Sequence, residues 1–160
     1  MTNEIDFEGY TCPVPIKPKD TVVLGHGSGG TLSRDLLNRL FLPELGKAAP
    51  RTLDDSAVVM IDHQRFALTT DSHVVSPLFF PGGDIGRLAI CGTVNDLAMV
   101  GATPVALTCG FVLEEGLSFE ILQRVVASMN EAAKEAGVYI APRDTTLVPK
   151  GGADRFSVNA

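Results

Sequence analysis

The sequence predicts an α/β fold of the α+β type, in which a mixed sheet carries its helices on one face. Short apolar runs typical of strands alternate with longer segments in which apolar residues recur every three or four positions, as in helices. The predicted order of elements is β-α-β-β-α-β-α-β-β, without an internal repeat. The chain has 160 residues, of which 45% are hydrophobic, so it is long enough for one domain with its own core.

The N-terminal part begins with residues 1–20, which contain three prolines and no periodicity and are expected to form a flexible leader before a domain at 21–160. We expect a strand at 21–24, a glycine-rich turn at 25–30 and a helix at 31–41, with Pro43 marking its end. The apolar face of this helix consists of Leu32, Leu36, Leu37, Leu40 and Phe41.

The middle of the chain predicts a β-hairpin, because two short apolar runs at 57–61 and 66–70 are separated by four polar residues. His63 lies in the turn of that hairpin and is expected to be exposed. After a loop at 76–83, Asp84 is expected to cap a helix that runs to about Val100.

The C-terminal part predicts a strand at 105–113, a second long helix capped by Ser118, and short strands at 138–141 and 156–158. Gly137 follows the end of that helix, as glycine commonly does. Its expected apolar side consists of Phe119, Leu122, Val125, Val126, Met129 and Ala133.

Composition excludes several functions. A net charge of −6 argues against a nucleic-acid-binding surface, which needs clustered basic residues. No apolar run is long enough to span a membrane, and residues 1–20 contain no signal-peptide core. Cys12, Cys91 and Cys109 are odd in number and widely spaced, so they predict neither a metal-ligand pair nor a disulfide framework. A reducing cytoplasm is the simplest location.

The glycine-rich turn at 25–30 leads into a helix, where free backbone N–H groups and the helix dipole favour phosphate. Gly25, Gly27 and Gly30 also fit a dinucleotide-binding fingerprint. That site needs a carboxylate at the end of the following strand, whereas Asp54 and Asp55 precede the strand at 57–61. We therefore expect a phosphate-handling loop of another kind, in which His26 either contacts phosphate or has no special role.

Acidic residues recur at the ends of the predicted elements and in turns. Carboxylates that converge on one site need cations, and Mg²⁺ that bridges them to phosphates is the usual solution. Alternatively, each is only a turn residue or a cap. Asn95 and Asp96 stand inside an otherwise apolar helix and are therefore either exposed or facing a site, while His73 could line the same cleft. The acidic positions are Asp54, Asp55, Asp71, Asp96 and Asp144.

Several segments together resemble the HypE family of hydrogenase maturation factors, from about Leu24 to Asn159. The segment 95–102 alone would indicate only the wider superfamily of aminoimidazole ribonucleotide synthetase, thiamine monophosphate kinase and selenophosphate synthetase. The segments 77–83 and 110–116 narrow the resemblance to HypE. The matching segments are 27–30, 69–75, 77–83, 95–102 and 110–116.

The resemblance implies the fold of the N-terminal domain of aminoimidazole ribonucleotide synthetase, which pairs as a homodimer through a shared β-barrel with ATP at the interface. It also implies an activity. The carbamoyltransferase HypF places a carbamoyl group on a C-terminal cysteine, and ATP-dependent dehydration converts the group to thiocyanate. The cyanide then reaches the iron of a [NiFe] hydrogenase precursor through the HypC–HypD complex.

Matching residue by residue, the resemblance implies ATP and Mg²⁺ as cofactors. The implied nucleotide-binding residues are His26, Gly27, Ser28, Gly29, Gly30, Asp71, Asn95, Asp96 and Asp144. The implied metal ligands are Asp55, Asp71, Asp96 and Asp144, and Asp54 could substitute for Asp55.

The chain departs from the family pattern in two ways. The second domain and its acceptor cysteine are absent, so no catalytic residue is assigned and the chain alone is not expected to complete turnover. Arg143 and Thr146 replace a glycine and a lysine of the pattern. Two alternatives therefore stay open: a non-catalytic binding or dimerisation module, and another ATP-dependent enzyme of the same superfamily.

Overall fold

The computed structural model describes residues 21–46, 54–153 and 155–160. The chain divides into two compact units, Met1–Arg51 and Thr52–Ala160, and each is described by itself. The predicted leader at 1–20, with Cys12, lies outside the described residues.

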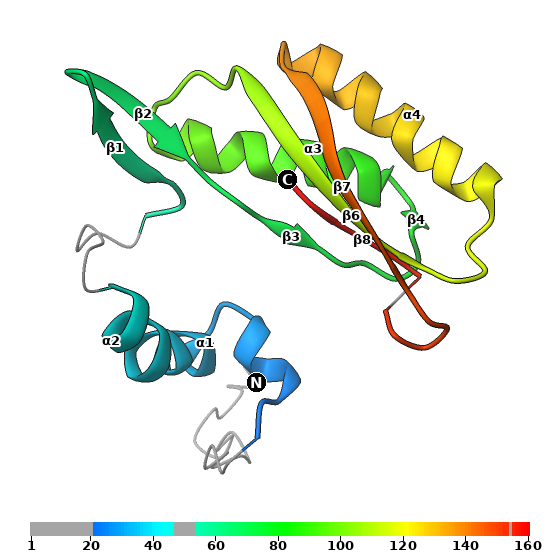
Figure 1. Ribbon diagram of the computed structural model, residues 1–160, viewed down its shortest axis with the longest axis horizontal. Coiled ribbons are helices and arrows are strands. Elements are labelled where there is room, and N and C mark those ends of the chain that lie inside the picture. The colour runs from blue at the N-terminus through cyan, green and yellow to red at the C-terminus, as the bar shows by residue number, and fades with distance from the viewer. Residues whose placement is uncertain (1–20, 47–53, 154) are drawn as a thin grey trace, which may run out of the picture. The chain divides into compact units, whose positions relative to one another are not determined.

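The described part of the first unit is helical (Figure 1). It contains a 3₁₀ turn η1 (Leu24–Gly27), helix α1 (Thr31–Leu36), a π-helical turn η2 (Leu37–Phe41) and α2 (Leu42–Leu45). The strand predicted at 21–24 is wrong. Residues 21–46 contain no strand that could pair with it, and the His26 ring accepts a hydrogen bond from the Val23 N–H at 3.0 Å, which favours a turn.

The helix predicted at 31–41 begins where expected but continues past Pro43 to Leu45. Pro43 is the second residue of α2, which directly follows the π-helical turn η2. No described residue of this unit is buried, and Leu40 and Phe41 of the predicted apolar face are about half exposed.

The second unit begins with the predicted hairpin, formed by β1 (Ala57–Ile61) and antiparallel β2 (Gln64–Leu68). Its loop has only two residues, Asp62 and His63, both with positive φ (48° and 66°). Such a turn matches the twist of paired strands, so β2 begins two residues earlier than predicted. His63 is exposed in the turn, as expected.

The main sheet is mixed, as predicted. Its order is β3 (Ser72–His73), β8 (Phe156–Asn159), β6 (Ala106–Glu114) and β7 (Tyr139–Val148). Strands β6 and β7 are parallel, whereas β8 is antiparallel to β6 and to β3. The prediction ended β7 at Ala141 because polar residues follow. The strand continues to Val148 because β6 offers it a partner over its whole length. A small hairpin of β4 (Phe79–Phe80) and β5 (Gly83–Asp84) was not predicted.

Helices α3 (Ile85–Met99) and α4 (Phe119–Ala136) cover one face of this sheet, as predicted (Figure 1). The predicted caps are confirmed. Asp84 accepts from two N–H groups of α3, Ser118 accepts from the Ile121 N–H at 3.2 Å, and Gly137 ends α4 at φ 71°. The core consists mainly of Ile85, Ala89, Ile90, Leu107, Cys109, Val125, Met129, Phe156 and Val158.

The apolar side predicted for α4 is correct at Val125, Met129 and Ala133 but wrong at Phe119, which is 88% exposed. Phe119 is the first residue of the helix, and the fully buried stripe begins only with Val125. Val126 is also exposed, because the stripe passes through Ala132 instead. Among the described residues, none of the helices has the length and apolar character needed to cross a membrane.

Candidate functional site

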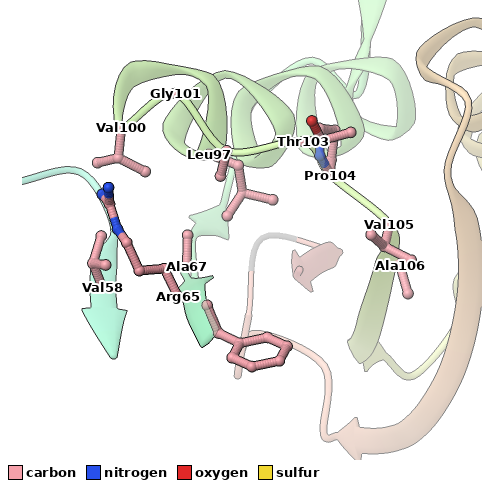
Figure 2. A pocket seen from close by; sticks show the side chains of 12 residues that line it. Val58, Arg65, Ala67, Leu97, Val100, Gly101, Thr103, Pro104, Val105 and Ala106 are labelled. Atoms are coloured by element: carbon pink, nitrogen blue, oxygen red, sulfur yellow. The ribbon is translucent and has the colours of Figure 1, made fainter. Parts of the chain in front are cut away.

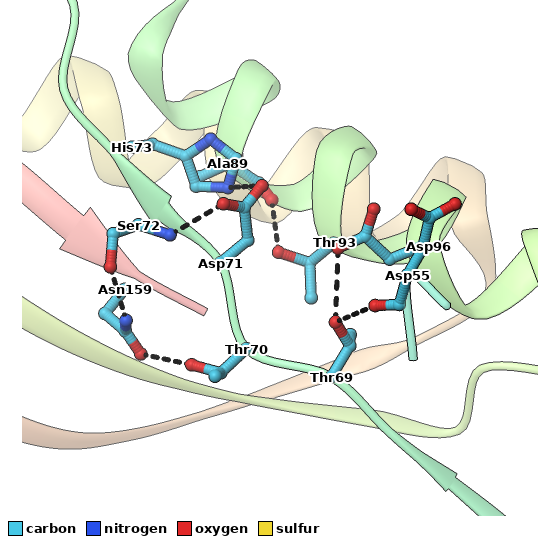
Figure 3. A network of polar contacts seen from close by, with 10 residues as sticks. All are labelled: Asp55, Thr69, Thr70, Asp71, Ser72, His73, Ala89, Thr93, Asp96 and Asn159. Carbon is cyan, nitrogen blue, oxygen red and sulfur yellow. Dashed lines mark hydrogen bonds and ion pairs between the residues drawn. The ribbon is translucent and has the colours of Figure 1, made fainter. Parts of the chain in front are cut away.

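The connection between β2 and β3, residues 69–71, runs beside helix α3 (Figure 3). Its polar contacts bring the candidate site residues together. The Thr69 hydroxyl lies 3.1 Å from Asp96 Oδ2 and 3.0 Å from the Asp55 carbonyl oxygen. Its single hydrogen is shared between these two acceptors. The Ser56 hydroxyl donates to the Asp96 carbonyl oxygen at 2.9 Å. Three segments far apart in sequence therefore meet at Asp96.

Asp71 lies two residues further along the same connection. Its backbone exchanges two hydrogen bonds with Ala160, which extends the β3–β8 pairing. Its carboxylate Oδ1 accepts the Ser72 N–H at 2.8 Å, and Oδ2 lies 3.3 Å from His73 Nε2. The side chain remains 43% exposed, so the carboxylate can still contact a ligand.

A chain of polar side chains links this connection to β8. Thr70 donates to Asn159 Oδ1 at 3.0 Å, and Asn159 Nδ2 donates to the Ser72 hydroxyl at 2.8 Å. Asn159 is paired with Gly110 of β6, and on the other side of β6 Gly110 is paired with Asp144. Asp144 and Asn159 therefore flank a residue without a side chain, and both line a shallow hollow of 380 Å³.

Asn95 and Asp96 differ in exposure and in contacts. Asn95 is exposed on α3, whereas Asp96 is half-buried and faces Thr69. Asp54 and Asp55 line another hollow of 400 Å³, together with Arg65. Within residues 21–46, 54–153 and 155–160, no three acidic, histidine or cysteine side chains are grouped closely enough to hold a metal ion. The set of Asp55, Asp71, Asp96 and Asp144 as metal ligands stays a prediction.

The predicted phosphate loop lies in the first unit. The Ser28 hydroxyl donates to the Gly25 carbonyl oxygen at 2.8 Å, and the Gly29 N–H donates to the Ser33 hydroxyl at 2.9 Å. Gly29 has φ 74°, which glycine adopts without strain. The role of residues 26–30 in nucleotide binding stays a prediction, because the two units are described separately.

Residues 53–160 match the family "AIR synthase related protein, N-terminal domain". The chain belongs to this family. Carbamoyl dehydratase HypE of Escherichia coli K12 is 46% identical over 145 residues, which are 88% of this chain and 43% of that protein. The chain thus spans less than half the length of this curated relative.

Two solved structures resemble this member of the AIR synthase related family. A HypE–HypF complex matches with a TM-score of 0.70 and 49% identity, covering 78% of this chain and 40% of the other. HypE in complex with ATP matches with a TM-score of 0.59 and 51% identity, covering 87% and 41%. These comparisons confirm the resemblance to HypE and the fold class.

Another hollow of this AIR synthase related domain lies apart from these residues. Its volume is 710 Å³, and it lies between the β1–β2 hairpin and the connection from α3 to β6 (Figure 2). The lining is mainly apolar, with Phe66 and Leu97 among its residues and Arg65 as its charged side chain. It contains none of the candidate carboxylates, so it is not the site that the sequence predicts.

Sequence reasoning missed Thr69, Ser56 and Asn159 as parts of the site of this family member. Residues 69–72, which are rich in hydroxyl groups, belong to one of the segments that resemble HypE. That segment could have indicated Thr69. Asn159 is a single polar residue at a strand end, 89 residues from Thr70, and carries no local signal of its partner.

Proposed function

We propose that this chain supplies the ATP-binding half of a carbamoyl dehydratase that acts in [NiFe] hydrogenase maturation. The observation that carries the proposal is the contact between Asp96 of α3 and the hydroxyl-rich connection that holds Asp71, in a chain about 46% identical to proteins named HypE. One of the similar solved structures is that of HypE in complex with ATP.

The residues fit a site for magnesium and nucleotide by their chemistry. Ionised carboxylates offer only acceptor atoms, and hard oxygen donors are the ligands that Mg²⁺ takes. Asp71 and Asp96 would hold the metal, and Asp55 and Asp144 are the further candidates. Bound Mg²⁺ would neutralise the phosphate charge and orient ATP. Thr69 and Ser72 N–H already restrain the two carboxylates.

The reaction itself belongs to the longer protein. On this proposal a C-terminal cysteine carries the carbamoyl group, ATP phosphorylates the carbamoyl oxygen, and loss of phosphate leaves thiocyanate. An amide oxygen is a poor leaving group and phosphate is a good one, so the chain's task is to position ATP and balance its charge.

The proposal includes partners. A HypF-type carbamoyltransferase is supported by the HypE–HypF complex among the similar structures. A homodimer fits the apolar side chains left exposed on the β1–β2 hairpin, among them Met60 and Leu68. A HypC–HypD complex would receive the cyanide. The free thiols of Cys91 and Cys109 fit action in a reducing cytoplasm.

Calorimetric titration of the full chain with Mg-ATP tests the proposal. We expect saturable, magnesium-dependent binding that Asp71→Asn and Asp96→Asn each weaken by at least about tenfold. Asp62→Asn is the matched control, because it makes the same change in the exposed hairpin turn. Binding that survives both site variants would contradict the assignment of these carboxylates.

A second candidate is a non-catalytic binding or dimerisation module. It is favoured by Thr146, which is exposed on β7 where the resemblance expects a lysine that could face phosphate. A folded dimer that binds no Mg-ATP would support this function. Release of phosphate with a small-molecule substrate would instead point to another ATP-dependent enzyme of the superfamily.

A further inference from the structure

His73 lies on β3 against helix α3, and only 8% of its surface is exposed. The ring fits because residue 92 of α3 is glycine. A Cβ at Gly92 would lie 2.9 Å from His73 Cε1, closer than side chains pack, and 3.7 Å from Asp71 Oδ2. The absence of a side chain at Gly92 therefore gives an imidazole access to the buried side of the Asp71 carboxylate.

The ring nitrogen Nε2 of His73 is fully buried and makes no hydrogen bond of good geometry with any described residue. Asp71 Oδ2 lies 3.3 Å away and faces it (Figure 3). Burying a polar nitrogen without a partner is unfavourable, so such atoms need an explanation. A small movement of the Asp71 side chain, which is partly exposed, would complete the bond.

We propose that His73 is a positioning residue for Asp71, with its Nε2–H directed at Oδ2. The Ser72 N–H holds Oδ1 at 2.8 Å, so the carboxylate is restrained at both oxygens. Each oxygen has a second lone pair, which remains for a cation on the exposed side. Groups that restrain a metal-binding carboxylate from behind tune its affinity. The consequence for Mg-ATP rests on the proposed function.

Nuclear magnetic resonance of the imidazole nitrogens tests the contact without any ligand. The chain has three histidines, so His73→Phe assigns the signals of His73 by their loss. At about pH 8, where an ordinary histidine is neutral, we expect the tautomer with hydrogen on Nε2. Asp71→Asn should shift these signals and leave those of His26 and His63 unchanged. Hydrogen on Nδ1 of His73 in the unaltered chain would overturn the proposal.

Titration with Mg-ATP then separates positioning from packing. His73→Phe keeps a ring of similar size without the N–H, and His73→Gln restores an N–H donor near the position of Nε2. We expect about tenfold weaker binding for His73→Phe and recovery for His73→Gln. Equal affinity of His73→Phe and the unaltered chain would overturn the inference. An unaltered chain that binds no Mg-ATP would instead contradict the proposed function, and the tautomer would still decide whether His73 holds Asp71.

Discussion

Asp84 and Ser128 connect the two helices that cover the sheet, because the Ser128 hydroxyl donates a 2.6 Å hydrogen bond to Asp84 Oδ2. The other oxygen of the same carboxylate, Oδ1, accepts the N–H groups of Gly86 at 2.7 Å and Arg87 at 3.1 Å. One side chain thus caps the start of α3 and holds it against α4. The same helix carries Asp96 near its other end.

Removing this carboxylate should destabilise the fold. We expect Asp84→Ala to lower the free energy of unfolding by about 2 kcal/mol, because it loses a helix cap and the bond to Ser128 together. Asp84→Asn is the matched control, since an amide oxygen can still cap the helix. Urea denaturation followed by circular dichroism measures both. Equal stability of Asp84→Ala and the unaltered chain would show that the cap contributes nothing.

Thr69→Val tests the hydroxyl that restrains Asp96. Valine has the same shape but cannot donate to the Asp96 carboxylate or the Asp55 carbonyl oxygen. We expect a loss of about 1 kcal/mol in the free energy of unfolding. On the proposed function, Mg-ATP binding weakens as well. Thr145→Val, at an exposed position on β7, should change neither quantity. A Thr69→Val chain with unchanged stability would exclude a structural role for this bond.

Gly86→Ala tests how closely α3 and α4 approach. A Cβ at this position would lie 2.5 Å from the backbone oxygen of Val125, which can move only if α4 moves. Alanine favours a helix by about 1 kcal/mol, but overpacking against backbone exceeds that gain. We expect a net destabilisation of about 2 kcal/mol in urea denaturation. Gly92→Ala should have a smaller effect, because there the Cβ meets the His73 side chain. A larger destabilisation by Gly92→Ala than by Gly86→Ala would contradict this packing argument.

The Arg87–Glu135 pair links the same two helices, with Arg87 Nη1 donating to Glu135 Oε1 at 3.0 Å. This hydrogen bond and the charge of Arg87 lower the pKa of Glu135 below its ordinary value of 4.5. A carboxylate whose pKa is lowered by folding stabilises the native state above the ordinary pKa, and the contribution disappears as the pH falls through the lowered value.

Glu135→Gln should therefore be less stable than the unaltered chain at neutral pH, and the difference should vanish in acid. Urea midpoints measured from neutral pH to below 4.5 report it. High salt should reduce the difference at neutral pH, because both side chains are partly exposed. Glu131→Gln, an exposed change on the same helix, is the control and should show no such pH dependence. A constant difference at all pH values would contradict the ion-pair explanation.

Residues close together in the sequence were enough to predict the structural features that depend only on near neighbours, such as helix ends. Asp84 and Ser118 indicated the starts of both long helices and Gly137 the end of α4, because caps act within one helical turn. The strand predicted at 21–24 failed, since a strand exists only where another strand pairs with it. Strand β7 was predicted too short for the same reason, because pairing with β6 extends it through polar residues.

The sequence by itself determined the family, the mixed sheet with helices on one face, and the candidate carboxylates Asp71 and Asp96. These follow from periodicity, caps and matched segments, all of which can be recognised from residues close together in the sequence. Only the tertiary structure decided that Asp96 faces Thr69 while Asn95 is exposed, and that His73 reaches Asp71. Such contacts depend on where α3 packs against the sheet, and that packing is set by buried residues distant in sequence, such as Ile90 and Phe156.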